Sequence, residues 1–204
     1  MLIGLASLSG LACLGQAKAA VQPGDQAEIA EIEHYLDSIR TMSAEFQQFD
    51  EQGRVTTGRI YLARPGRMRV EYDPPTSYLL VASTGALVYY DPDVKQLTTL
   101  PLSSTPAAFL LKDHISLTKG VVVKSFERGP GTMRIEVADA DDESAGSVLL
   151  VFEDRPMALR QWTVTDAQGV KTQVVLTRTS FGVPLDPNLF AIPTINELRR
   201  GSNN

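Results

Sequence analysis

The chain is poor in the residue types that build disulfides, metal centres and acid–base pairs. Its 204 residues include one cysteine, Cys13, and two histidines, His34 and His114. A single cysteine excludes an intramolecular disulfide, and without an H-x-x-x-H pair or a Cys/His cluster a zinc site is unsupported. The sequence also lacks a P-loop, a G-x-S-x-G elbow and a G-x-G-x-x-G loop after a strand. We therefore expect a protein that is not an enzyme and that needs neither metal nor cofactor.

Positive charge is also in short supply. The net charge is −5, from 19 Lys and Arg against 24 Asp and Glu. Such a balance offers no basic face for nucleic acid, and it argues against adhesion to anionic lipid by charge alone. The densest carboxylate run, residues 139–143, is interpreted as a solvated loop, because a calcium loop needs a glycine and a distal glutamate at set spacing.

Residues 1–19 differ from the remainder and are predicted to be a secretory signal peptide. Leu2 to Leu14 is apolar, without an acidic residue, and Ala17-Lys18-Ala19 supplies an A-x-A cleavage signal. Two alternatives stay open: a buried N-terminal helix, and lipidation of Cys13. The first interpretation predicts export to the periplasm and leaves residues 20–204 as a single domain.

An amphipathic helix is expected from Asp25 to about Arg40. Asp25 and Glu28 have the spacing of a capping box. The apolar residues that follow at spacings of three and four are Ile29, Ile32, Leu36 and Ile39. They share one face of the helix, which must therefore cover something apolar.

Beyond Met42 the hydrophobic period changes from helical to two, which predicts strands. The expected strands are 44–50, 57–63, 66–72, 78–83, 86–90, 95–99, 121–127, 132–138, 147–153, 158–166 and 170–180. Most are joined by hairpin-length turns, which force antiparallel neighbours. Residues 105–111 interrupt the period-two pattern. Thr105 as N-cap and Pro106 at the first helical position predict a short apolar helix. Residues 184–190 are expected to form a turn and a short anchor.

These elements predict a mainly β (α+β) protein built on one sheet. About eleven antiparallel strands are many for an open sheet, which tends to curl or close. The two helices are available to cover its apolar face. The expected architecture is an unclosed half-barrel, with the N-terminal helix and the short central helix as a lid.

The most distinctive stretch runs from Ala63 to Pro75. A turn, Arg64-Pro65-Gly66, leads into alternation, with Met68, Val70 and Tyr72 on one face. Residues 83–98 then form a hairpin unit with its turn at Asp91-Pro92-Asp93. Together with the segments 43–48, 58–65, 163–169 and 189–190, in this order and spacing, the pattern resembles the LolA family of periplasmic outer-membrane lipoprotein carriers.

The resemblance implies an unclosed barrel of eleven strands with helices as a lid over a hydrophobic cavity. It implies acylated lipoproteins as cargo, an inner-membrane ABC lipoprotein exporter as donor and an outer-membrane lipoprotein acceptor as recipient, with the carrier as a monomer. It further implies that Arg64, matching the arginine of the family's R-P motif, is a lid latch that bonds to backbone carbonyls of the lid. A surface arginine beside a turn is the alternative.

The candidate lipid-binding residues follow from the resemblance and from the strand pattern. For the cavity they are Phe46, Met68, Val70, Tyr72, Leu80, Tyr89, Val151 and Trp162. For the lid they are Ile32, Leu36, Phe109 and Leu110. Trp162 is expected to share a face with Arg160 and Val164, and an ordinary core aromatic is the alternative role.

Other functions remain open at this point. The same fold suits a carrier of another lipid or a sensor of mislocalised lipoprotein. Lipidation at Cys13 would favour a membrane-anchored acceptor. A periplasmic hydrolase, or an assembly factor that docks proteins on the concave sheet, belongs to a different class.

Overall fold

The computed structural model describes residues 21–105 and 107–192. The helical elements are η1 (Pro23–Asp25), α1 (Gln26–Ser38), η2 (Leu102–Ser104), α2 (Ala107–Leu111), η3 (Glu143–Ala145) and η4 (Pro187–Phe190). The strands are β1 (Thr41–Phe49), β2 (Val55–Ala63), β3 (Arg67–Tyr72), β4 (Leu79–Ser83), β5 (Ala86–Asp91), β6 (Gln96–Pro101), β7 (Val121–Gly129), β8 (Thr132–Asp139), β9 (Gly146–Glu153), β10 (Ala158–Asp166) and β11 (Lys171–Phe181). The predicted signal peptide lies outside the described residues.

All eleven strands belong to one antiparallel sheet, in the order β6-β5-β4-β3-β2-β1-β11-β10-β9-β8-β7. The chain therefore makes two meanders that join where β1 pairs with β11. β6 and β7 are left as the two free edges. Because these edges do not pair, the sheet is the predicted open half-barrel.

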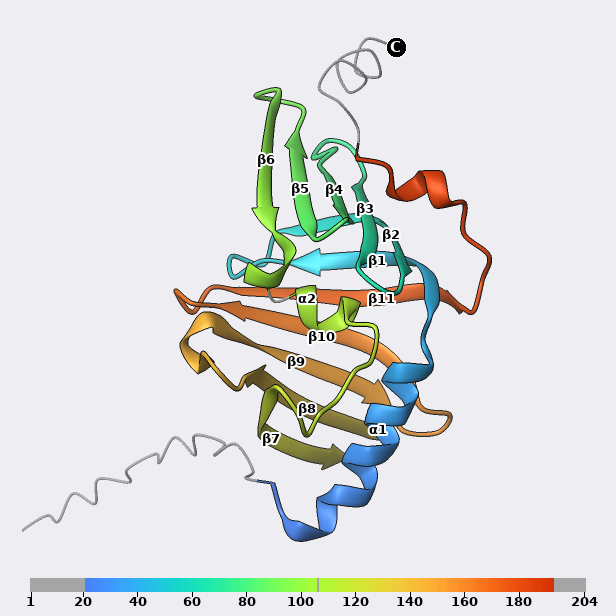
Figure 1. Ribbon diagram of the computed structural model, residues 1–204, viewed down its shortest axis with the longest axis vertical. Coiled ribbons are helices and arrows are strands. Elements are labelled where there is room, and N and C mark those ends of the chain that lie inside the picture. Colours follow the sequence, from blue (N-terminus) through green and yellow to red (C-terminus); the bar gives the residue numbers. More distant parts are fainter. Residues whose placement is uncertain (1–20, 106, 193–204) are drawn as a thin grey trace, which may run out of the picture.

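The sheet curls strongly around the two helices (Figure 1). Strands β3 to β6 stand upright in this view whereas β7–β11 run across it, and α2 lies over the middle of the sheet. Helix α1 crosses the ends of β7–β10. The predicted architecture of sheet and lid helices is confirmed, and the interior lies between them.

Helix α1 follows the predicted pattern on its apolar face but not at its cap. Ile29, Ile32 and Leu36 are buried as expected. The carboxylate of Asp25 instead accepts a hydrogen bond from the backbone N–H of Gln22 at 2.7 Å and closes the turn η1. The predicted capping box with Glu28 is therefore wrong, because the chain enters the helix through an extra 3-10 turn.

The second helix lies where the sequence predicts it, in the described part of residues 105–111. It spans Ala107–Leu111 and is preceded by the separate turn η2. The hydroxyl of Thr105 donates to the carbonyl of Leu102 at 2.8 Å, so it is used by η2.

At position 58 the sheet has room only for glycine, because the Phe46 ring and the backbone carbonyl of Glu71 both approach it closely. It pairs with Phe46 across β1 and β2 and with Tyr72 across β3. A Cβ atom at this position would stand 2.1 Å from the carbonyl oxygen of Glu71 and 2.8 Å from the Phe46 ring. Glycine thus leaves room for the Phe46 ring and for the backbone of β3.

We expect Gly58→Ala to destabilise the protein by about 1–3 kcal/mol, the range for forcing extra volume into a packed core. Urea unfolding would measure the change. Gly53→Ala is no suitable control because Gly53 has a positive φ of 74°, whereas Gly24 has nothing within 4 Å and is an open position. Equal stability of the Gly58→Ala and Gly24→Ala proteins would contradict the packing described here.

Candidate functional site

The concave face of the sheet and the two helices enclose one continuous apolar cluster. From α1 it contains Ile29, Ile32 and Leu36, and from α2 Phe109, Leu110 and Leu111. From the sheet its most central members are Phe46, Met68, Val70, Ile135, Leu150, Phe152, Trp162 and Val174. All four predicted lid residues lie in this cluster. The helices therefore act as an apolar cover for the sheet.

Five of the predicted cavity residues line small gaps under the lid. A gap of about 110 Å³ is bordered by Phe46, Met68, Val70, Tyr72 and Trp162, together with Leu110. A gap of about 20 Å³ adjoins it and is bordered by Met68, Trp162, Leu36 and Leu110. Side chains of the two helices thus nearly fill the space over the concave face of the sheet.

Three other predicted cavity residues lie elsewhere. Leu80 is half-buried and packs against the cluster from β4. Tyr89 lies at the β5 end of a row of edge-to-face aromatic rings that runs through Tyr78 to Tyr72. Val151 pairs with Arg134 and lies on the face opposite Leu150 and Phe152. Its assignment to the cavity is corrected, because successive residues of a strand point to opposite faces.

Trp162 reaches the concave face because of a β-bulge. The register of β10 against β9 shifts between Leu159 and Gln161. Both Leu159 and Trp162 are thereby buried, at 4% and 8% exposure. Arg160 falls at the bulge and bonds to Glu153 on the outer side. The expectation that Trp162 shares a face with Arg160 is therefore wrong.

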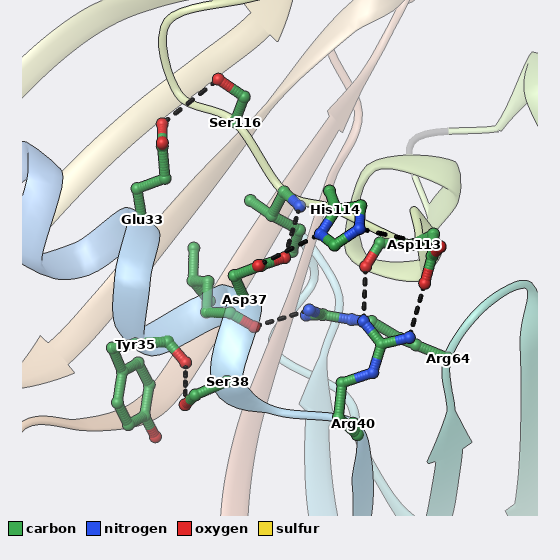
Figure 2. A network of polar contacts seen from close by, with 11 residues as sticks. Glu33, Tyr35, Asp37, Ser38, Arg40, Arg64, Asp113, His114 and Ser116 are labelled. Atoms are coloured by element: carbon green, nitrogen blue, oxygen red, sulfur yellow. Dashed lines mark hydrogen bonds and ion pairs between the residues drawn. The ribbon is translucent and has the colours of Figure 1, made fainter.

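Arg64 is buried between the two helices. Its Nη1 donates to the carbonyl oxygen of Leu36 in α1 at 2.6 Å, as Figure 2 shows. Its Nε donates to the carbonyl oxygen of Leu110 in α2 at 2.9 Å. The side chain is only 6% exposed, and burial lowers the pKa of Arg64 to about 10, so it stays charged at neutral pH. One guanidinium thus links both lid helices to the end of β2.

The turn after Arg64 adds a second tie to the same helix. The backbone N–H of Gly66 donates to the carbonyl oxygen of Leu111 at 2.8 Å. These carbonyls belong to the last turn of each helix, where the backbone acceptors have no partner within the helix. The Arg64-Pro65-Gly66 turn donates to these carbonyls, and the Leu36 carbonyl also accepts from the backbone N–H of Ile39 at 3.3 Å.

Helix α1 also holds the segment that follows α2, through two carboxylates one turn apart (Figure 2). Glu33 accepts hydrogen bonds from the backbone N–H of Leu117 at 2.6 Å and from the Ser116 hydroxyl at 3.2 Å. Asp37 accepts one from the backbone N–H of Ile115 at 2.9 Å. We call residues 102–117 the lid segment, and Glu33 and Asp37 its α1 clamp.

Charged side chains surround the clamp. Arg40, just beyond α1, donates to the backbone carbonyl of Asp113 at 2.6 Å and also pairs with its carboxylate. The His114 ring lies 3.3 Å from the Asp37 carboxylate. The Ile115 N–H is the main cause that lowers the pKa of Asp37, and His114 adds to it. Sequence reasoning missed this clamp, although the i, i+4 spacing of Glu33 and Asp37 places both on one side of α1.

We expect Asp37→Asn to loosen the lid segment and to lower stability by about 1 kcal/mol, a charge-assisted hydrogen bond discounted for partial exposure. Because the pKa of Asp37 is lowered by folding, its contribution is present at neutral pH and is lost as pH falls below the ordinary value of 3.8. The stability difference from the parent protein should therefore be largest near pH 7 and shrink in acid. Thermal unfolding from pH 7 to pH 3 would measure it.

Ser38→Ala is the matched control for this prediction. Ser38 is the next residue of α1, and its hydroxyl bonds only to the carbonyl of Tyr35 among the bonds drawn in Figure 2. A difference between Asp37→Asn and the parent that does not change with pH would contradict the role given to the Asp37 charge.

Two polar groups lie within the otherwise apolar concave face. The hydroxyl of Tyr72 donates to Oε1 of Gln48 at 2.6 Å. Burial raises the pKa of Tyr72 to about 12, so the phenol stays neutral. The Tyr72 ring also meets the Phe46 ring edge to face at 5.2 Å between centroids. This end of the interior can therefore offer hydrogen bonds to an amide or ester as well as apolar surface.

Within residues 21–105 and 107–192, no three His, Cys, Asp or Glu side chains are grouped so that they could hold a metal ion. The described helices include none that is long and apolar enough to cross a membrane. What the arrangement supplies is a covered apolar interior with a hydrogen-bonded cover.

Comparison with known proteins gives this arrangement a family. A sequence profile described as "Outer membrane lipoprotein carrier protein LolA" matches residues 37–193, which is most of the chain. The chain belongs to the LolA family. An "Outer-membrane lipoprotein carrier protein" of Methylococcus capsulatus is 31% identical over 169 residues, covering 78% of this chain and 80% of the relative.

Two further similar proteins are a sequence relative and a solved structure. A carrier protein of the same name from Chromobacterium violaceum is 27% identical over 198 residues, covering 94% of this chain and 91% of that protein. Among solved structures, a LolA superfamily protein of Nitrosomonas europaea has a TM-score of 0.47 at 11% identity, covering 80% of this chain and 97% of that one. The sequence profile and the relative from Methylococcus capsulatus confirm the family resemblance seen in the sequence.

Proposed function

We propose that this LolA-family chain carries acylated lipoproteins through the periplasm by burying their acyl chains between the concave sheet and the lid helices. The observation that carries the proposal is Arg64, which ties both helices over an apolar interior through the carbonyls of Leu36 and Leu110. A covered apolar interior answers a physical need, since each methylene exposed to water costs about 0.8 kcal/mol.

The apolar lid side chains explain how such a carrier could release its cargo. Opening the lid of an empty protein exposes Ile32, Leu36, Phe109 and Leu110, which are now buried. Exposing each of these side chains would cost about 1.5–3 kcal/mol of hydrophobic free energy. Acyl chains that enter the interior replace this burial. Closure therefore competes with cargo for the same apolar surface, and that competition keeps binding reversible.

The names of the relatives support the direction of transport. Several are called "Outer-membrane lipoprotein carrier protein". We propose that the chain accepts lipoproteins from an inner-membrane ABC exporter and passes them, as a monomer, to an outer-membrane acceptor. Its action is binding and transfer, without a chemical step.

Release of lipoprotein from the inner membrane would test the carrier role. Purified protein is added to spheroplasts that synthesise a labelled lipoprotein, and the soluble complex is collected. We expect the carrier to release the acylated lipoprotein. It should not bind a variant of that lipoprotein whose lipidated cysteine is changed to serine. Equal binding of the unacylated form would overturn the proposal and favour a protein-docking surface.

Export is the second part of the proposal. We propose that residues 1–19 direct the chain to the periplasm and are removed after Ala19, where A-x-A ends. N-terminal sequencing of the periplasmic protein should begin at Ala20. A lipidated N-terminal Cys13 would instead contradict a soluble carrier and favour an anchored acceptor.

A further inference from the structure

A cavity lies between the lid segment and the ends of strands β7, β8 and β9. It has a volume of about 590 Å³, within the range of roughly 300–1,000 Å³ typical of ligand sites. One wall is the first half of the lid segment, and the opposite wall is formed by β7, β8 and the start of β9. Its lining residues are Ser103, Ser104, Thr105, Ala108, Phe109, Lys112, Val121, Val137, Ala138, Asp139, Asp142, Ala145, Gly146, Ser147 and Val148. We call it the seam cavity.

The floor of the seam cavity is apolar and continuous with the central interior. Phe109, Val137 and Val148 line it and belong to the main hydrophobic cluster. Val148 also borders the 110 Å³ gap under Trp162. The two spaces thus meet at one side chain, and the end of α2 lies between them.

The charged residues that line the seam cavity, which we call its rim, come from both of its walls. Lys112 stands on the lid side, and Asp139 and Asp142 stand on the side of the sheet. Both carboxylates accept backbone hydrogen bonds in their own loop: Asp139 from Asp141 at 2.8 Å, and Asp142 from Ser144 at 3.1 Å. The Ser144 hydroxyl also holds the pKa of Asp142 below its usual value. Such a rim keeps the polar end of a ligand in water while the floor takes its apolar part.

Arg64, Gly66 and the α1 clamp hold the second half of the lid segment, and the seam cavity borders its first half. Arg64, Gly66 and the α1 clamp bond to residues between Leu110 and Leu117. The first half of the segment instead bonds to the β4–β5 turn, through the N–H of Leu102 and the carbonyl of Gly85 at 2.9 Å. The residues to which Arg64, Gly66 and the α1 clamp bond do not line the seam cavity.

We propose that the seam cavity binds a single acyl chain while Arg64 still holds the lid closed, so that loading begins at the seam. The ligand is one saturated chain with its ester or amide at the rim. This inference rests on the proposed carrier function, and it adds a first binding step that precedes opening of the lid.

A photoreactive single-chain probe would test the seam site directly. The periplasmic protein is incubated with a diazirine analogue of palmitic acid, irradiated and mapped by peptide mass spectrometry. We expect one probe per chain, attached within residues 103–109 or 137–148. Labelling confined to peptides that contain Met68, Tyr72 or Trp162 would overturn the proposal.

Variants from the two walls separate binding at the seam from binding under the lid. Ala108→Trp and Val121→Trp fill the cavity from opposite sides, and each should reduce probe binding at least tenfold. The parent protein, in which the Arg64 bonds are intact, should already bind this first chain without the Arg64→Leu change. The control is Val55→Trp, at an exposed position on β2 away from the cavity. An unchanged thermal unfolding temperature will show that each variant is folded. If one of the two filling variants does not fold, the other still tests the proposal.

The possible outcomes also distinguish this proposal from the carrier function. If the filled variants still bind the probe, but release acylated lipoprotein from spheroplasts normally, the seam site is wrong and the carrier function stands. If Arg64→Leu is needed before any probe binds, loading begins under the lid and the seam proposal fails. If neither probe nor acylated lipoprotein binds the parent protein, both proposals fail.

Discussion

Arg64→Leu is expected to leave the protein folded but to trap its cargo. Leucine is compatible with a buried position between apolar helices, but it cannot donate to the carbonyls of Leu36 and Leu110. Each hydrogen bond from a charged donor contributes about 1.5–3 kcal/mol, and the cost of burying the guanidinium offsets part of that sum. The closed, empty state should therefore be weakened relative to the loaded one. Because 1.4 kcal/mol is a factor of ten, we expect lipoprotein to be retained at least tenfold longer.

The transfer defect can be measured by loading the carrier with a labelled lipoprotein and adding outer-membrane vesicles. Arg67→Leu is the matched control: it makes the same change three residues later, at a side chain that lies over the Phe190 ring instead of the lid. We expect the control to deliver cargo normally. If the Arg64→Leu protein delivered cargo at the same rate as the parent protein, the proposed latch role of Arg64 would be contradicted.

Phe152→Ala should be among the most destabilising single changes in the sheet. Phe152 is fully buried at 0% exposure, and its ring meets that of Tyr35 from α1 edge to face at 6.0 Å between centroids. Removal of a core phenylalanine costs about 3–5 kcal/mol through lost burial and the cavity that remains. Denaturant unfolding should show this loss, together with looser packing of α1 on the sheet.

The neighbouring residue provides the control for this prediction. Val151 lies on the opposite face of β9, paired with Arg134. Its replacement by alanine should cost less than about 1 kcal/mol, as for partly exposed positions outside the core. If Val151→Ala were as damaging as Phe152→Ala, the assignment of the two faces of β9 would be contradicted.

Much of the fold could be predicted from the sequence because its period is informative. A period of two over short segments, separated by hairpin turns, identified all eleven strands to within a few residues. The apolar spacing of Ile29, Ile32 and Leu36 identified the buried face of α1. Short connections then imposed antiparallel pairing, so an open curved sheet with helical covers followed from local patterns.

The errors arose where one residue changes the face of a strand. At β10 the bulge between Leu159 and Gln161 resets the alternation, so Arg160 points outward although Trp162 points inward. In β9 the choice of Val151 over Leu150 or Phe152 could not be made from composition, because all of these residues are apolar. A one-residue offset moves a whole apolar set to the other side of a sheet.

The contacts that hold the lid were only partly visible in the sequence. Arg64 stood out because of the R-P motif that it shares with the LolA family. The α1 clamp did not, since Glu33 and Asp37 bond to backbone N–H groups of residues more than 75 positions away. Backbone donors carry no sequence signature, so only the folded chain brings these partners together.

The measurement that tests the central claim most directly is mass spectrometry of the protein purified from its native periplasm without detergent. If the chain buries acyl chains for transport, acylated lipoprotein should co-purify with it, and the Arg64→Leu protein should carry more. Phospholipid or another free lipid in place of lipoprotein would contradict the lipoprotein-carrier account and make the chain a carrier of that lipid.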